Sequence, residues 1–427
     1  MMISFLLLAA VAAEPAFPPD PAAPAVDAAP LSPGADPEDR RPRLSIGPGL
    51  FPAEPGPGIN LWGDRNLVRP SFYLWGEVRA AAAWSRHGHL TEGAALAGDL
   101  QADWKLTPSE RFHARFLPGL ESDGKRSLTW GNDESSQAPD LRPESLYFET
   151  DLGAMASSLF RQPASFESRL AFGLVPIRLG QGLWIDDSVL GAVINSPWSL
   201  PGWDSSDSGT VLFAGAGQAW APLNDERADA LLGVHQFFDT GLGRFEWGVA
   251  GVETEADHLL SPMLSWSGHL GAWTSSLSGT SVQGDEASGF AVLARNRFDL
   301  DPCSPYVNVF CGDQGQALLR DRRRPGLFRE AGICFAFDPL APLPVLSGGD
   351  GFIEGAALGA AWALCEQQDL TFELAGVAGD EVRGAAAGLQ HSWKWRSDTE
   401  LATTLVHRCG DGQAPASGLS FAWIWHF

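Results

Sequence analysis

Charged side chains recur at every second position in several segments of this sequence. From Leu100 to Leu106, and again from Arg111 to Phe116, charged or polar residues alternate with apolar ones. Successive side chains of a strand point to opposite faces, so each segment predicts one charged and one apolar face. Fixed charges of both signs around a water-filled space would filter solutes by charge and size. The inward candidates are Asp99, Asp103, Arg111, His113, Arg115, Glu149, Asp151, Arg244, Glu246, Glu373 and Arg383.

Motifs for catalysis or metal binding are weak by comparison. The nine histidines are scattered, and no Gly-x-Ser-x-Gly elbow accompanies them. His87-Gly-His89 lacks a nearby third ligand, and the acidic pair Asp186-Asp187 lacks the spaced oxygen ligands of a calcium site. We therefore expect no enzyme activity, no metal and no cofactor. A triad assembled from distant strands stays open, since such triads are recognised by geometry.

The composition favours a membrane-spanning β-structure. Only 19% of the 427 residues are charged, while the chain contains 48 glycines and 17 tryptophans. No window offers the ~18 uninterrupted apolar residues of a membrane helix. The net charge of −23 argues against nucleic-acid binding. We expect the basic cluster Arg320–Arg324 to form an exposed loop or rim patch.

The last nine residues, Leu419–Phe427, form a period-two apolar stripe whose members on one face are mostly aromatic. Such a strand suits an outer face in lipid that ends in an aromatic girdle. The ending resembles the closing strand of bacterial outer-membrane β-barrels. That resemblance implies that Trp423, Trp425 and Phe427 act as a signal for the barrel-assembly machinery.

Similar alternation recurs from about Phe72 onward, and no amphipathic helix is expected there. We predict an all-β fold, a single antiparallel transmembrane β-barrel of about 16 strands, within a range of 14 to 18. The C-terminal strand ending in Phe427 would close it against the first strand near Phe72–Trp84. A secreted β-sandwich array is the competing fold. The expected loops are Glu121–Asp140, Ser196–Ser208, Leu300–Pro325 and Leu340–Asp350.

The N-terminal part divides into two segments ahead of a barrel at 71–427. Residues 1–13 have the short apolar core and small-residue end of a signal peptide, although no basic residue precedes the core. Residues 14–70 form a Pro/Ala-rich stretch with thirteen prolines between Pro15 and Pro57. Because proline removes backbone donors, we expect a disordered periplasmic linker without a sheet ladder.

The five cysteines cannot all pair within one chain. Cys303 and Cys311 flank a short segment and are candidates for a loop disulfide, whereas Cys334 and Cys365 are candidates for a cross-strand pair. Cys409 is expected to be a small wall residue.

A different pattern covers Phe172–Ser188, which reads as a strand followed by a Gly-rich bend. It is similar to stretches of large porin-like barrels, including alginate-export-like ones, in which strand and bend lead toward the pore.

These observations together predict an outer-membrane porin that passes small hydrophilic solutes or ions by passive diffusion. One alternative is a plugged outer-membrane barrel acting as receptor or export conduit. Another is a secreted β-rich binding or adhesion protein. The expected partners are the outer-membrane lipid bilayer, the barrel-assembly machinery and small hydrophilic solutes, with assembly into a homo-oligomer left open and no nucleic acid.

Overall fold

The structure of the chain is a computed structural model. It describes residues 44–46, 68–87, 89–117, 119–122, 125–126, 128–131, 138–140, 143–198, 208–217, 219–221, 226–285, 288–313, 317–320, 327–336, 343–346, 351–380, 382–411 and 413–427. The expected signal peptide, and most of the expected linker, lie outside these residues.

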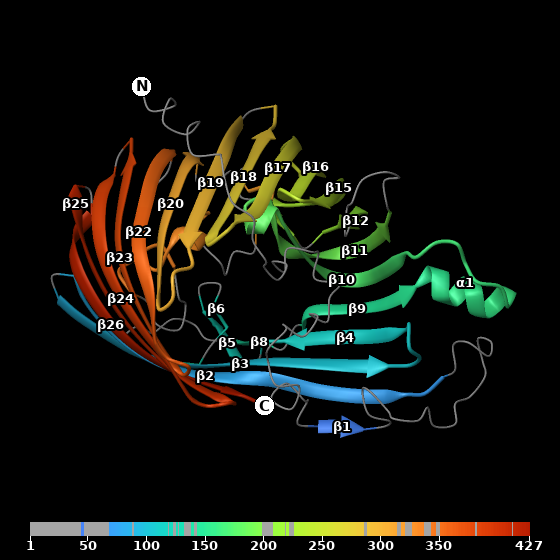
Figure 1. Cartoon of the computed structure of the whole chain (residues 1–427), viewed down its shortest axis with the longest axis horizontal. Coiled ribbons are helices and arrows are strands. Elements are labelled where there is room, and N and C mark those ends of the chain that lie inside the picture. Colours follow the sequence, from blue (N-terminus) through green and yellow to red (C-terminus); the bar gives the residue numbers. More distant parts are fainter. Residues whose placement is uncertain are drawn as a thin grey trace.

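Eighteen antiparallel strands form one closed barrel (Figure 1). They are β2 (Ser71–His87), β3 (His89–Lys105), β4 (Arg111–Phe116), β9 (Pro143–Asp151), β10 (Arg169–Leu179), β11 (Ile185–Pro197), β12 (Ser208–Ala216), β15 (Ala230–Thr240), β16 (Gly243–Glu253), β17 (His258–Leu270), β18 (Trp273–Gln283), β19 (Ser288–Phe298), β20 (Cys303–Asp313), β22 (Phe352–Cys365), β23 (Gln368–Gly379), β24 (Arg383–Arg396), β25 (Thr399–Asp411) and β26 (Gln413–His426). The count lies at the upper end of the predicted range, above the expected value of 16.

Short strands complete the structure. β7 (Leu128–Gly131) pairs with β3 beyond the stretch that β4 covers, and β21 (Leu319–Arg320) pairs in parallel with β11. β5 (Gly119–Ser122), β6 (Lys125–Arg126) and β8 (Ala138–Asp140) form a small separate sheet, and β13 (Trp220–Ala221) pairs with β14 (Glu226–Arg227).

The barrel closes where the C-terminal strand meets the first strand, as predicted. β26 pairs with β2 from Glu77 to Arg86, and Phe427 exchanges two backbone hydrogen bonds with Gly76 at 2.9 and 3.0 Å. Beyond Gly76 the edge of β2 is occupied by β1 (Leu44–Ile46). The expectation of no sheet ladder is wrong for these three residues, which contain no proline, so no backbone donor is missing. The disordered linker at 14–70 stays a prediction.

The outer surface of the barrel is apolar. Aromatic side chains continue across neighbouring strands from Trp104 to Phe112, Phe148 and Phe172, with ring centroids 4.9–5.8 Å apart. Large exposed apolar residues also occur on the strands from β11 to β26, and three of them are Leu264, Leu358 and Trp423. An exposed apolar face that encircles a closed barrel is the surface a lipid bilayer covers. The hairpin predicted at Leu100–Phe116 is present, with Asp103 opposite His113.

No helix within the described residues is long and apolar enough to cross a membrane. The one α-helix among them is α1 (Leu152–Phe160), which follows β9, although no amphipathic helix was expected. Asp151 caps it by accepting hydrogen bonds from the backbone N–H groups of Gly153 and Ala154 at 2.8 and 3.0 Å. The candidate lining residue Asp151 therefore ends a strand and starts a helix.

One expected loop contains a barrel strand. β20 occupies Cys303–Asp313, within the expected loop Leu300–Pro325, and carries Val307 and Val309 on its outer face. Its first and last cysteines, Cys303 and Cys311, lie along the same strand, where eight residues span about 26 Å. That separation excludes the loop disulfide. All five cysteines are free, so the cross-strand pair is wrong too, and Cys409 is exposed.

Candidate functional site: the constricted interior of the barrel

Six predicted lining residues lie together on the inner face of β3, β4 and β9. The guanidinium of Arg115 donates to the Asp99 carboxylate at 2.9 and 3.0 Å. Arg111 Nε donates to Glu149 Oε2 at 2.7 Å, and His113 Nδ1 lies 2.7 Å from Asp103 Oδ1. Trp104 and Phe112 point outward from the same strands. Alternation in these strands therefore separates a charged inner face from an apolar outer one.

The remaining candidates are dispersed. Arg244 Nε donates to Asp239 Oδ1 at 2.7 Å. Glu246, two residues further along β16, is buried, and its Oε2 lies 3.4 Å from His235 Nε2. Arg383 differs from expectation. It is exposed at the start of β24, at the same parity as the outward Leu389, so it is left out of the inner face.

The interior is narrowed first by the hairpin of β10 and β11. Beyond Leu174, β10 pairs only with β11, and β11 pairs with β12 only from Leu190 onward. The intervening tip therefore has no wall strand on either side. Gly173, with φ of +127°, lies opposite Gly191 where the hairpin leaves the wall. A Cβ at Gly191 would lie 2.0 Å from the carbonyl oxygen of Ala214, so this bend requires glycine.

The hairpin tip packs against the inner face of the nearby wall strands β12, β16 and β17. Trp184 is fully buried, and its Nε1 donates to Ser261 Oγ on β17 at 2.9 Å. Its indole meets the ring of Phe213 edge-on. Leu179 and Ile185, on either side of the turn, are also fully buried. The tip is thus held by an apolar core inside the barrel rather than by the strand ladder.

A second inner segment lies between β20 and β22, and its described residues are 317–320, 327–336 and 343–346. The backbone N–H of Leu318 donates to the carbonyl of Trp184 at 2.9 Å, which joins this segment to the hairpin tip. Arg320, expected at an exposed rim, is buried and donates to the Gly182 carbonyl at 3.2 Å. Burial lowers the pKa of Arg320 to about 9, and the neighbouring charge of Arg329 acts in the same direction.

Charged side chains join the two inner segments to each other and to the wall. Arg329 pairs with Asp186, and Arg178 Nη2 donates to Glu330 Oε1 at 3.0 Å. From the wall strand β19, Arg295 Nη2 donates to Gln181 Oε1 at 2.5 Å. We call this set the constriction cluster: Arg178, Gln181, Asp186, Arg295, Arg329 and Glu330.

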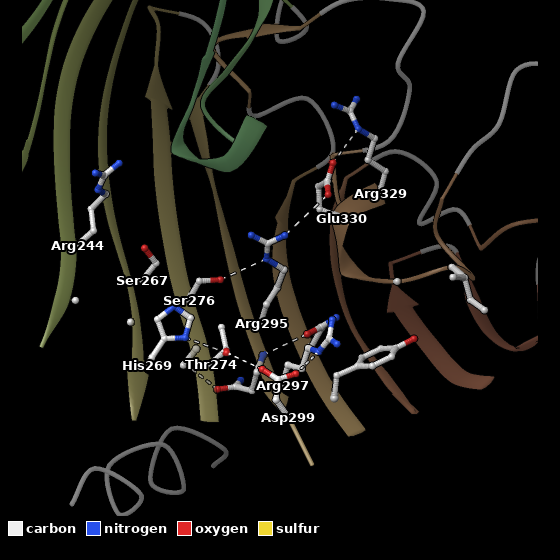
Figure 2. A pocket seen from close by; sticks show the side chains of 18 of the residues that line it. Arg244, Ser267, His269, Thr274, Ser276, Arg295, Arg297, Asp299, Arg329 and Glu330 are labelled. Carbon is white, nitrogen blue, oxygen red and sulfur yellow. Dashed lines mark hydrogen bonds and ion pairs between the residues drawn. The ribbon is translucent and has the colours of Figure 1, made fainter. Parts of the chain in front are cut away.

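A cavity of about 940 Å³ adjoins the constriction cluster. Figure 2 shows Arg329 and Glu330 at one side of it, His269 and Arg297 on the wall strands β17 and β19, and Asp299 just after β19. Arg297 Nε donates to Asp299 Oδ1 at 2.7 Å, so a positive and a negative charge lie side by side at this wall. The lining therefore presents both signs of charge to a solute.

The constriction cluster was not predicted from the sequence. Asp186 was noticed only as half of an acidic pair, and Arg329 and Glu330 were not singled out. The sequence signal that pointed to this region was the Gly-rich bend after Phe172, which resembles pore-directed stretches of other barrels. The hairpin that turns inward here agrees with that resemblance. Among the residues that the structure describes, no group of three or more His, Cys, Asp and Glu side chains is arranged to hold a metal ion.

No protein-family model matches the sequence. A search of curated proteins gives no match either.

Solved structures do match, over most of both chains. OccK11 (OpdR) of Pseudomonas aeruginosa is 8% identical, with 83% of this chain and 96% of that chain covered and a TM-score of 0.55. The outer membrane protein OpdK of the same organism is 8% identical, with 83% of this chain and 98% of that chain covered and a TM-score of 0.52. OccAB1 of Acinetobacter baumannii is also 8% identical, with 83% of this chain and 96% of that chain covered and a TM-score of 0.54. At such identities the likeness concerns the fold. The chain therefore has the closed antiparallel barrel fold of the outer-membrane porins.

Proposed function

We propose that the protein is an outer-membrane porin that passes small hydrophilic solutes or ions by passive diffusion, without a chemical reaction or cofactor. The observation that carries this proposal is the combination of an apolar outer belt with a charged interior. The interior is narrowed at the constriction cluster and widens into a cavity of about 940 Å³. Fixed charges at such a narrow point select solutes by charge and size.

We infer a preference for anions from the pairs in which the guanidinium is the more exposed partner. The exposed fractions are 30% for Arg115 against 13% for Asp99, and 48% for Arg178 against 34% for Glu330. The order is reversed for Arg244 and Asp239, at 14% and 22%, and for Arg295 and Glu330, at 28% and 34%. At Arg115 and Arg178 a solute would meet positive charge first. Of the solved relatives, OpdK has been crystallised with vanillate, at 9% identity and a TM-score of 0.52. Organic carboxylates are therefore suitable probes for this chain.

The test is conductance in a planar bilayer, with purified protein whose folding is verified by heat-modifiable migration on a denaturing gel. We expect discrete conductance steps. Under a potassium chloride gradient the reversal potential should have the sign of a preference for chloride, and vanillate should reduce the chloride current. A neutral sugar of similar size serves as the control solute.

Folded, inserted protein without conductance would contradict the porin proposal and favour a plugged receptor or export conduit. Solubility of the processed chain without detergent would contradict the membrane assignment as well, in favour of a secreted binding protein. Turnover in esterase or lipase assays that is lost in a Ser→Ala variant would contradict the absence of an enzyme activity.

For assembly, we propose that Trp423, Trp425 and Phe427 form the signal read by the barrel-assembly machinery. All three lie at the end of the strand that closes the barrel, and Trp425 and Phe427 contact each other with ring centroids 5.3 Å apart. Whether copies of the chain form a homo-oligomer stays a prediction, which the mass of the detergent-solubilised protein would test.

A further inference from the structure

A buried carboxylate on the barrel wall contacts the inner segment 327–336. Glu373, on the inner face of β23, has no exposed surface. Its Oε1 accepts a hydrogen bond from the backbone N–H of Cys334 at 2.8 Å, and its Oε2 accepts one from Ile333 N–H at 3.1 Å. The hydroxyl of Tyr306, on β20, donates to the same Oε2 at 2.5 Å.

All three of these donors are neutral, and two of them belong to the backbone of the inner segment. A buried carboxylate is strongly destabilised unless donors replace its water, so Glu373 and the turn at 332–334 depend on each other. Successive backbone N–H groups that converge on one anion form a nest. Here the anion comes from the wall, and the nest comes from the segment inside the barrel.

The fit at this contact leaves no spare space. A Cβ added to Gly332 would lie 2.0 Å from Glu373 Oε2, although the φ of Gly332 is extended and open to any residue. The wall also supports the segment through Asn308, whose Nδ2 donates to the Ala331 carbonyl at 2.6 Å. Phe310 stacks on Phe328 with ring centroids 4.2 Å apart. The segment is thus packed on β20, and Glu373 reaches it from β23.

We propose that Glu373 is the positioning residue of the constriction: its carboxylate holds the 332–334 turn against the wall. Arg329 and Glu330 lie two to three residues before this turn and supply two charges of the constriction cluster. Glu373 itself touches no solute, because it is fully buried. It therefore sets the position of the selective charges without being one of them. Only the conduction readout of this proposal rests on the proposed function.

Cys334 provides a direct test in the intact chain, because it is fully buried and sits in the turn. Burial and the neighbouring Glu373 raise the pKa of the Cys334 thiol, which keeps it protonated and slow to react. The other four cysteines are replaced by serine, and the folded barrel in detergent is exposed to a small maleimide. Labelling of Cys334 should be slow in this background and about tenfold faster or more with Glu373→Ala.

Glu373→Gln should give an intermediate rate, because its amide oxygen can still accept a hydrogen bond, whereas its nitrogen cannot. The matched control is Glu246→Ala, which removes another buried inward carboxylate, one whose hydrogen-bond partner is His235 on the wall. It should leave the labelling of Cys334 unchanged. Heat-modifiable migration shows that each variant retains a folded barrel.

Gly332→Ala disrupts the same contact from the side of the inner segment. It should raise Cys334 labelling by itself, and in the double variant with Glu373→Ala the two effects should not add, because the shorter side chain leaves room for the new methyl group. In bilayers, both single variants should shift the reversal potential relative to the four-serine background.

Equal labelling of Cys334 in the background and in Glu373→Ala, with both barrels folded, would overturn the proposal, as would additive effects in the double variant. Rapid labelling in Glu373→Ala, in a protein that never conducts, would uphold the anchor and contradict the porin function instead. The two failures are therefore distinguishable.

Discussion

Charged residues inside this barrel occur as pairs, and the exposure of each partner decides which charge a solute meets. Arg329 keeps 17% of its side chain exposed, while its partners Asp186 and Glu330 keep 4% and 34%. Arg178, at 48%, is the most exposed arginine of the constriction cluster. A carboxylate that is shielded by its own partner contributes less field to the open space than an exposed guanidinium does. Selectivity should therefore depend on individual arginines rather than on the net charge of −23.

Replacing Arg178 by glutamine should lower the permeability ratio of chloride to potassium by about twofold or more, because one exposed positive charge leaves the constriction. The measurement is the reversal potential under a salt gradient. Arg396→Gln is the matched control, since Arg396 lies over the ring of Trp395 at the end of β24. An unchanged ratio for Arg178→Gln would show that this arginine does not face the conduction path.

At the scale of elements, the hairpin of β10 and β11 belongs to the wall where it pairs with β9 and β12, and its tip, between Leu174 and Leu190, lies in the interior. The change occurs at the pair Gly173 and Gly191, where side chains would collide with neighbouring backbone. Between Gly173 and Gly191 the tip is stabilised by burial of Trp184 and its apolar neighbours, in place of the hydrogen bonds that a wall strand would form with it. The narrowing of the interior therefore depends on two glycines and one apolar core.

Gly191→Ala should destabilise the folded barrel by about 1–3 kcal/mol, since the added methyl group meets the backbone of β12, which cannot rotate away. The temperature at which the folded band converts to the unfolded band on a denaturing gel should fall. Gly376→Ala is the matched control on a wall strand, because its Cβ would meet its nearest atom only at 3.7 Å. Equal transition temperatures for the two variants would contradict the proposed bend.

For the whole molecule, closure joins the two ends of the barrel sequence and leaves no free edge between β2 and β26. Phe427 completes the ladder through its two hydrogen bonds with Gly76, and its ring lies 3.1 Å from the position that a Cβ at Gly76 would take. The last residue thus contributes both to the seam and to the apolar belt. Below the seam, β1 covers the remaining edge of β2.

Replacing Phe427 by aspartate should reduce the amount of inserted protein severalfold while leaving the conductance of each inserted channel unchanged, because the residue belongs to the seam and contacts no member of the constriction cluster in the described contacts. Outer-membrane fractionation measures the first quantity and single-channel recording the second. Phe298→Asp, at the end of β19, is the control for loss of one exposed aromatic side chain. Normal insertion of the Phe427 variant would remove the assembly-signal proposal and leave the barrel intact.

Several features of this fold follow from the sequence without its structure. Alternation identified the closing strand, its pairing with the first strand and the hairpin Leu100–Phe116, because period two in a strand reports directly which side chains share a face. The same rule placed Asp99, Arg111 and Arg115 inside. Two expectations were wrong: Arg383 was placed inside although it shares the parity of the outward Leu389, and the strand β20 was placed in a loop.

Only the tertiary structure decided what fills the interior. The contact of Glu373 with Cys334 spans 39 residues, and the pair of Arg329 with Asp186 spans 143. The alternation of residues along one strand does not encode such long-range contacts. They form because the bend at Gly173 and Gly191, and the burial of apolar side chains inside the barrel, bring distant segments together. The sequence by itself therefore determined a closed barrel with a charged inside. The location of the constriction, and the residues that hold it, came from packing across the barrel.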